Sequence, residues 1–222
     1  MNADDPLKVA EAQRFIEGIY NYCDRWCERC AFITRCLHYV QLQKPEFQEM
    51  LEETAGQNQK RFEAAFGHYL PQAAELYGLV VERWFNRNET ALHQRLQKAK
   101  TGEEISSDQL LPEDVEDAIE VIRWYQFLPA AKLVSVLAVD KTEEAARHQP
   151  PNDNGQIKVA LIGIDRSLLA WGCVQMFWPE RAREIMRFAG LLSELRLEME
   201  LEFPDARDFL RPGFDEASEH VM

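Results

Sequence analysis

Glycine and proline are scarce in this chain, since each accounts for only ten of its 222 residues. A low content of the two residues that interrupt helices favours long helices with few tight turns. The sequence also has no sustained alternation of apolar and polar residues with a period of two, which is the pattern of a half-buried β-strand. We therefore expect an all-α protein, a bundle of four to six helices.

Positive charge is also in short supply. Lys and Arg total 25 against 38 Asp and Glu, which gives a formal net charge of -13. Because sequence-independent binding to nucleic acids and anionic lipids rests on Lys and Arg, neither is an expected partner. The longest apolar stretch, 157–178, is interrupted by Lys158 and by the adjacent Asp165 and Arg166, so we expect no membrane-spanning segment.

The first residues lack the basic and then apolar pattern of a secretory signal. Five cysteines, an odd number, are unlike the paired framework of a secreted disulfide-rich domain, so we expect a cytoplasmic protein. A hydrophobic content of 46% is enough for one large core. We expect a single helical domain over 1–222, with a cysteine-bearing helix over 7–36, a main helical body over 59–202 and an extended C-terminal tail over 203–222.

Apolar residues in the main body recur every three or four positions, which is typical of amphipathic or buried helices. This pattern predicts helices over about 59–100, 112–139, 157–178 and 179–202. We expect Pro71 to kink the first of them. Pro112 and Pro179 are expected to open the second and the fourth, because proline is tolerated at the first helical position.

Four of the five cysteines are concentrated in one short segment: Cys23, Cys27, Cys30 and Cys36. Apolar residues around them also recur every three or four positions, which predicts a helix. On that helix the first three thiols would project from one side, within about 60° of one another, whereas Cys36 would point away. Binding of all four to one centre therefore requires a break between Ala31 and Arg35, although no Gly or Pro lies there.

An ordinary apolar stripe is the alternative explanation for these cysteines, because cysteine can act as a small hydrophobic residue. A continuous core helix would explain Cys23 and Cys30, but it would not explain the local density of cysteine. Metal ligation can contribute on the order of 10 kcal/mol of folding free energy, enough to impose a turn. We therefore predict a metal site formed by Cys23, Cys27, Cys30 and Cys36 at the end of the first long helix.

An iron-sulfur cluster of the [4Fe-4S] type fits the predicted helix better than zinc. Cys23 and Cys30 would lie roughly 10 Å apart along a straight helix. Zinc holds its thiolates about 2.3 Å from one atom, whereas a [4Fe-4S] cluster distributes them over separate irons. Zinc is kept as the alternative. Arg25, Arg29 and Arg35 would help to keep the thiolates ionised.

The spacing Cys23-x3-Cys27-x2-Cys30 resembles the cluster motif of radical S-adenosylmethionine enzymes. That family implies a repeating strand-helix barrel, and the sequence predicts no such strands. The spacing Cys27-x2-Cys30-x5-Cys36 resembles the iron-sulfur motif of RecB-like nucleases and the auxiliary-cluster motif of some radical enzymes. Those nucleases use a Glu-x-Lys motif that is absent from this chain. Both resemblances are confined to the cysteine segment, so they imply cluster chemistry and no particular enzyme activity.

The helical body itself has few candidate sites. None of the histidines belongs to the Glu-x-x-His motif of carboxylate-bridged di-metal sites, and no Gly-rich phosphate loop is present. Lys132 and Asp165 lie inside the two most apolar helices. They are expected either to pair in the interior, as some functional sites do, or to reach water or a structural bridge. An enzyme site between these helices is one hypothesis, so enzymatic activity is left open.

The sequence thus predicts a cytoplasmic metalloprotein whose four-cysteine site, an iron-sulfur cluster, serves electron transfer or redox sensing. The alternative is a non-enzymatic interaction protein in which zinc has a structural role. In that case the acidic surface or the tail over 203–214 would meet a protein partner. No pattern in the sequence indicates a particular oligomeric state.

Overall fold

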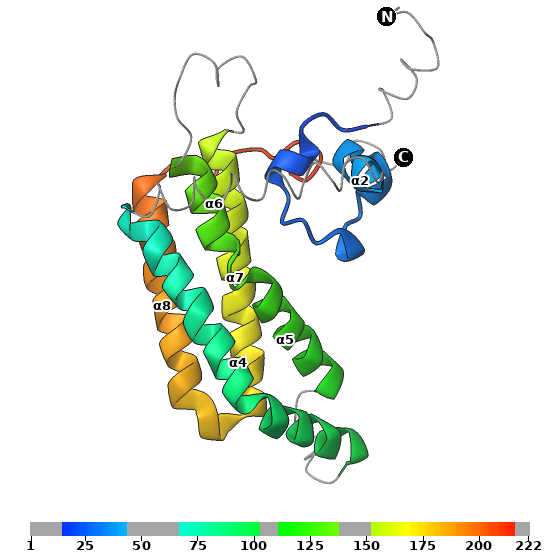
Figure 1. Cartoon of the computed structure of the whole chain (residues 1–222), viewed down its shortest axis with the longest axis vertical. Helices are drawn as coiled ribbons and strands as arrows, with labels where there is room; N and C mark the ends of the chain where they lie inside the picture. Colours follow the sequence, from blue (N-terminus) through cyan, green and yellow to red (C-terminus); the bar gives the residue numbers. More distant parts are fainter. Residues whose placement is uncertain (1–14, 44–66, 103–110, 138–151, 216–222) are drawn as a thin grey trace, which may run out of the picture.

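The structure, a computed structural model, describes residues 15–43, 67–102, 111–137 and 152–215. These residues form helices and turns, and none of them belongs to a β-strand. The body of the protein is built from α4 (Tyr69–Thr101), α5 (Pro112–Tyr125), α6 (Leu128–Leu137), α7 (Asp153–Phe177) and α8 (Ala182–Glu202) (Figure 1). For the described residues, the prediction of an all-α bundle of four to six helices is confirmed.

Helix α7 is the central element of the bundle. It packs against α5, α6 and α8, and α4 packs against α6 and α8 (Figure 1). Side chains on several sides of α7 are fully buried, including Ile157, Leu161, Ile164 and Trp171. A helix that is apolar nearly all round belongs in the interior of a bundle, which agrees with the position of α7.

Aromatic side chains fill the core where α4, α7 and α8 meet. The Trp84 ring lies edge-on to Trp171 and to Phe188, with ring centroids 5.4 Å and 6.1 Å apart. The indole N–H groups of Trp84 and Trp171 both have hydrogen-bond acceptors. The Trp171 indole donates to the Tyr77 hydroxyl at 2.9 Å, and the Trp84 indole donates to Glu184 at 2.7 Å. The aromatic side chains at this junction therefore pack closely while their polar atoms form hydrogen bonds.

Several details differ from the prediction: α4 begins only at Tyr69, and α7 begins at Asp153, four residues before its predicted start. Pro71 lies in the first turn of α4 and introduces no kink, because its missing N–H is one that would have no intrahelical partner there. The segment predicted as one helix over 112–139 is divided into α5 and α6. Pro129 in the first turn of α6 accounts for the division, since its ring would clash with a carbonyl of a continuing helix. Residues 59–66, 138 and 139 of the predicted helices lie outside the described part.

The other expected starts are confirmed. Helix α5 begins at Pro112, and Pro179 opens a 3₁₀ turn, η5 (Pro179–Arg181), that leads directly into α8. Asn152 caps α7, because its side chain accepts a hydrogen bond from the Gly155 N–H. None of the helices in the four described segments is both long enough and apolar enough to cross a membrane.

The predicted cysteine-bearing helix over 7–36 does not form in its described part. Residues 15–36 contain three short 3₁₀ turns, η1 (Ile19–Tyr22), η2 (Cys27–Arg29) and η3 (Ile33–Arg35), and a short helix, α2 (Leu37–Leu42), follows them. Gly18 and Arg25 adopt left-handed conformations, with φ angles of 69° and 60°, which interrupt any regular helix. In residues 15–36 the spacing of apolar residues by three and four therefore corresponds to successive short turns and not to one helix.

We expect the two glycines Gly78 and Gly172 to respond in opposite ways to replacement by alanine. A Cβ at Gly78 on α4 would lie 2.4 Å from the Phe127 ring and 2.9 Å from the Gln126 carbonyl oxygen, so the α5–α6 junction would have to move. Gly78→Ala should lower the free energy of unfolding by about 1–3 kcal/mol. A Cβ at Gly172 on α7 would meet nothing within 4 Å, and Gly172→Ala should raise that free energy by up to about 1 kcal/mol. Urea unfolding followed by circular dichroism measures both values, and a Gly78→Ala protein as stable as Gly172→Ala would contradict this packing.

Candidate functional site

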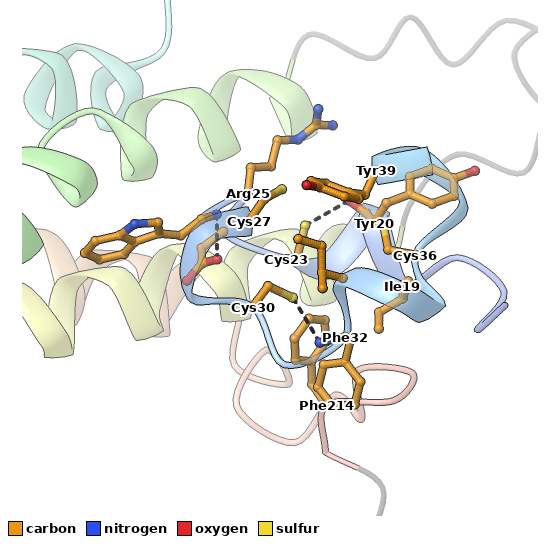
Figure 2. A pocket seen from close by; sticks show the side chains of 13 residues that line it. Ile19, Tyr20, Cys23, Arg25, Cys27, Cys30, Phe32, Cys36, Tyr39 and Phe214 are labelled. Atoms are coloured by element: carbon orange, nitrogen blue, oxygen red, sulfur yellow. Dashed lines mark hydrogen bonds between the residues drawn. The ribbon is translucent and has the colours of Figure 1, made fainter. Parts of the chain in front are cut away.

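Cys23, Cys27, Cys30 and Cys36, the four predicted ligands, line a single pocket (Figure 2). The enclosed part of this cysteine pocket is about 20 Å³, and the rest of the pocket is open to solvent. All four residues are half-buried free thiols. The rest of the lining is mainly apolar and aromatic: Ile19, Tyr20, Asp24, Arg25, Trp26, Phe32, Ile33, Tyr39 and Phe214. The structure therefore brings the four cysteines together, Cys36 included.

The thiols converge because the backbone turns between them. They do not lie on one face of a helix. Cys23, Cys30 and Cys36 each follow one of the 3₁₀ turns in extended conformation, and Cys27 opens η2. The break expected between Ala31 and Arg35 is present, because η3 ends at Arg35 and Cys36 is extended, with φ of -102° and ψ of 109°. The chain also leaves helical conformation at Cys23 and Cys30, where no Gly or Pro predicts a break.

The sulfur atoms of Cys23 and Cys30 form hydrogen bonds with the backbone, and the Cys23 thiol donates to the Tyr20 carbonyl oxygen at 3.5 Å (Figure 2). The Phe32 N–H donates to the Cys30 sulfur at 3.4 Å (Figure 2). Burial raises the pKa of the Cys23 thiol, and a hydrogen bond from the backbone of Arg25 opposes this rise. The Phe32 and Arg25 donors each lie two residues after the cysteine. A hydrogen bond donated to sulfur favours the thiolate over the thiol, and the thiolate is the form that binds metals.

Electrostatic interactions connect the four thiols. Burial raises the pKa of Cys27, and the neighbouring sulfurs of Cys23, Cys30 and Cys36 raise it further. Burial also raises the pKa of Cys23, while the positive charges of Lys132 and Arg25 act in the opposite direction. Ionisation of Cys23 and Cys27 is therefore less favourable than that of an exposed thiol.

Asp24 anchors the cysteine segment to the helical bundle. Its side chain accepts hydrogen bonds from the Trp26 N–H at 3.1 Å and from the Tyr125 hydroxyl, and it pairs with Arg166 at 3.1 Å. Burial and the neighbouring Asp24 carboxylate raise the pKa of Tyr125, so its hydroxyl remains a donor. The Trp26 ring stacks on Trp124 with centroids 5.0 Å apart, and the Trp124 indole donates to the Asp24 carbonyl oxygen. No local sequence signal identified Asp24, since its partners on the helical bundle lie a hundred or more residues away.

The chain closes the other side of the pocket with residues 203–215, which we call the C-terminal strap. Phe214 lies edge-on to Phe32, with ring centroids 5.0 Å apart. Asp215 pairs with Lys158 of α7 at 2.9 Å and with Arg211 at 2.8 Å, and the three side chains are at most 18% exposed. The hydrogen bonds from Arg211 and Lys158 hold the pKa of Asp215 well below its usual range. The strap is thus fixed to α7 close to Phe214.

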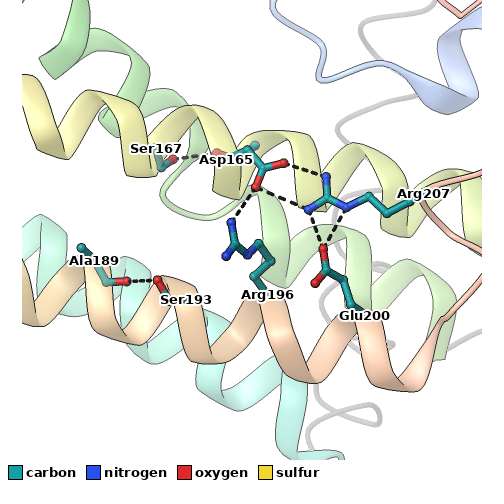
Figure 3. Close-up of polar contacts among 8 residues, drawn as sticks. Asp165, Ser167, Ala189, Ser193, Arg196, Glu200 and Arg207 are labelled. Carbon is teal, nitrogen blue, oxygen red and sulfur yellow. Dashed lines mark hydrogen bonds and ion pairs between the residues drawn. The ribbon is translucent and has the colours of Figure 1, made fainter.

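Lys132 and Asp165 do not form the buried pair that was one expectation. Asp165 pairs with Arg207 of the strap at 2.6 Å and with Arg196 of α8 at 3.4 Å, and Arg207 also pairs with Glu200 (Figure 3). Asp165 is therefore part of a half-exposed structural bridge, which was the other expectation. The Lys132 ammonium instead donates to the Gln156 side-chain oxygen at 2.9 Å. Gln156 precedes Asp165 by nine residues, roughly 13 Å along α7, so one lysine cannot reach both.

As their side chains are placed, the described residues contain no group of three or more His, Cys, Asp or Glu that could hold a metal ion. The four-cysteine metal site therefore stays a prediction, and the shared pocket is the observed feature. Comparisons of the chain with protein-family models, with curated proteins and with solved structures found no match. The residues of the pocket are accordingly the basis for any statement about function.

Phe214→Ala should open the strap side of the cysteine pocket. Because the Phe214 ring covers Phe32 and lines the pocket, its loss should make the cysteines of the reduced, metal-free protein react several-fold faster with the thiol reagent DTNB. Leu210→Ala is the control, since Leu210 lies on the same strap and is 68% exposed. Equal reaction rates for the two variants would mean that Phe214 does not shield the thiols.

Proposed function

We propose that the cysteine pocket holds an iron-sulfur cluster of the [4Fe-4S] type, ligated by Cys23, Cys27, Cys30 and Cys36, and that the protein serves electron transfer or redox sensing. The observation that carries the proposal is the convergence of four thiols from four separate turn positions on one pocket. Core packing would not require this arrangement, because cysteines that only fill space have no reason to share a half-open cavity.

The residues of the pocket fit such a group in donor type and in charge. The Phe32 N–H donates to the Cys30 sulfur, and a hydrogen bond from the backbone of Arg25 lowers the pKa of the Cys23 thiol. Hydrogen bonds to the sulfurs, local charge and solvent exposure are the main means by which proteins adjust a cluster's reduction potential. When bound, the cluster would supply one-electron redox chemistry. The thiolates would hold the cluster, and the side chains of Trp26, Phe32 and Phe214 would limit the access of water to it.

Zinc and a cluster differ in the space that they need between the four thiolates. Structural zinc sites are closed, with four thiolates drawn to about 2.3 Å from one atom. A cluster of several irons and sulfides has a volume of its own, and its ligands surround that volume. The enclosed part of the cysteine pocket is about 20 Å³, so its size does not favour a cluster over a single ion.

Structural zinc is the second candidate, and the conformation of the cysteine segment favours it. Three short 3₁₀ turns have few internal backbone hydrogen bonds, so a metal that joins the cysteines would stabilise the segment directly. The protein would then be an interaction protein without redox chemistry. Both candidates place the chain in a reducing compartment, the cytoplasm, with a protein as its partner.

Metal analysis of protein purified without oxygen tests the proposal. We expect brown protein that contains stoichiometric iron and acid-labile sulfide and absorbs visible light. Colourless protein with one zinc per chain would support the second candidate. Protein without iron or zinc would rule out both.

Substitution of single cysteines then tests the ligand set. Cys36→Ser should lower the metal content severalfold, because a serine hydroxyl is a much poorer ligand than a thiolate for iron-sulfur clusters and zinc. Cys173→Ala is the matched control, since Cys173 lies on α7 against the hydrophobic core and does not line the pocket. Unchanged metal content in Cys36→Ser would show that Cys36 is not a ligand.

A further inference from the structure

Lys132 is a buried cation whose hydrogen-bond partner is neutral. Its side chain on α6 is 9% exposed, and its ammonium group donates to the amide oxygen of Gln156 at 2.9 Å. In the described part of the chain, no carboxylate lies within ion-pair distance of this ammonium. A buried charge without an opposite charge is expensive, and an amide oxygen compensates only part of that cost.

Several buried or half-buried charged side chains near the site have partners of opposite sign. Asp24 pairs with Arg166, and Asp215 pairs with Lys158 and Arg211. Lys132 therefore differs from these neighbours. Among the described residues, the pocket of four thiols is a nearby group that would carry negative charge when ionised.

A chain of hydrogen bonds connects Lys132 to the cysteine segment. Gln156 accepts from Lys132, and its amide nitrogen donates to the backbone oxygen of Asn21 in η1. Asn21 precedes Cys23 by two residues, so one glutamine holds both the ammonium and the turn that carries the first thiol. Lys132 also lies close enough to Cys23 for charges on the two side chains to interact. Burial lowers the pKa of Lys132 to about 8, which leaves it positively charged at neutral pH.

We propose that Lys132 is the buried counter-charge of the four-thiolate metal site, a positioning residue that acts through its charge and is not itself a ligand. This inference rests on the proposed function, because four thiolates around zinc or a [4Fe-4S] cluster leave a net negative charge. Other cations near the pocket are less suited to the role. Arg25 and Arg35 are exposed, and Arg29 is paired with Asp117 and Glu120 on α5.

This role predicts effects of opposite sign in the two forms of the protein. Lys132→Met keeps a similar side-chain length and removes the buried charge. The metal-free protein should therefore unfold at the same or a higher temperature than the metal-free wild type. The metal-loaded protein should release its metal to a chelator about tenfold faster or more, the size of effect that residues supporting metal ligands commonly have. A side chain that only contributed packing would change both forms in the same direction.

The experiment uses the full chain, purified without oxygen and loaded with the metal that it carries in the wild type. Release to EDTA and thermal unfolding are measured for the wild type, Lys132→Met, Lys132→Gln and Lys132→Arg. Lys100→Met is the control, because Lys100 pairs with Glu116 on the surface. We expect Lys132→Met and Lys132→Gln to lose metal faster, Lys132→Arg to retain it better than either, and Lys100→Met to behave as the wild type.

The outcomes separate this inference from the proposed function. Wild-type protein that binds no metal overturns both. Wild-type protein that binds metal, with equal release rates in Lys132→Met and Lys132→Gln, overturns the role of Lys132 and leaves the metal site intact. A metal-free Lys132→Met protein that is clearly less stable than the metal-free wild type also overturns it, since the lysine would then have a structural role. If Lys132→Met does not fold, Lys132→Gln decides, because it keeps a polar group beside Gln156.

Discussion

The arrangement of the cysteines depends on the docking of a segment that cannot hold its shape alone. Three 3₁₀ turns joined by extended residues have few backbone hydrogen bonds of their own, so tertiary contacts have to fix their positions. Asp24 and Trp26 provide the main attachment. The Asp24 carboxylate binds Tyr125 and Arg166, and the Trp26 ring stacks on Trp124. Without the surface formed by α5 and α7, the segment would lack the partners that define its turns.

The bundle was largely predictable from the sequence. Prolines marked the starts of α5 and α8, and the apolar character of 157–178 predicted the central position of α7. These signals are local, and so are the structures that they specify. The division between α5 and α6 was missed, although Pro129 announces it, because the apolar pattern continues on both sides of the break.

The candidate site was predictable in its residues and not in its conformation. Spacing alone drew attention to Cys23, Cys27, Cys30 and Cys36, but the same spacing suggested a helix that the chain does not form. The decisive contacts of Asp24, and the path from Lys132 through Gln156 to Asn21, join residues that are far apart in the sequence. Such long-range partners follow from packing, and no local propensity encodes them.

The walls of the cysteine pocket come from two parts of the chain that are made at different times. Residues 19–39 leave the ribosome before the helices of the body, whereas Phe214 follows all five of them. During synthesis the thiols are therefore present long before the strap that covers them. The cysteines are therefore most accessible to other molecules in that interval, and completion of the chain covers one side of their pocket.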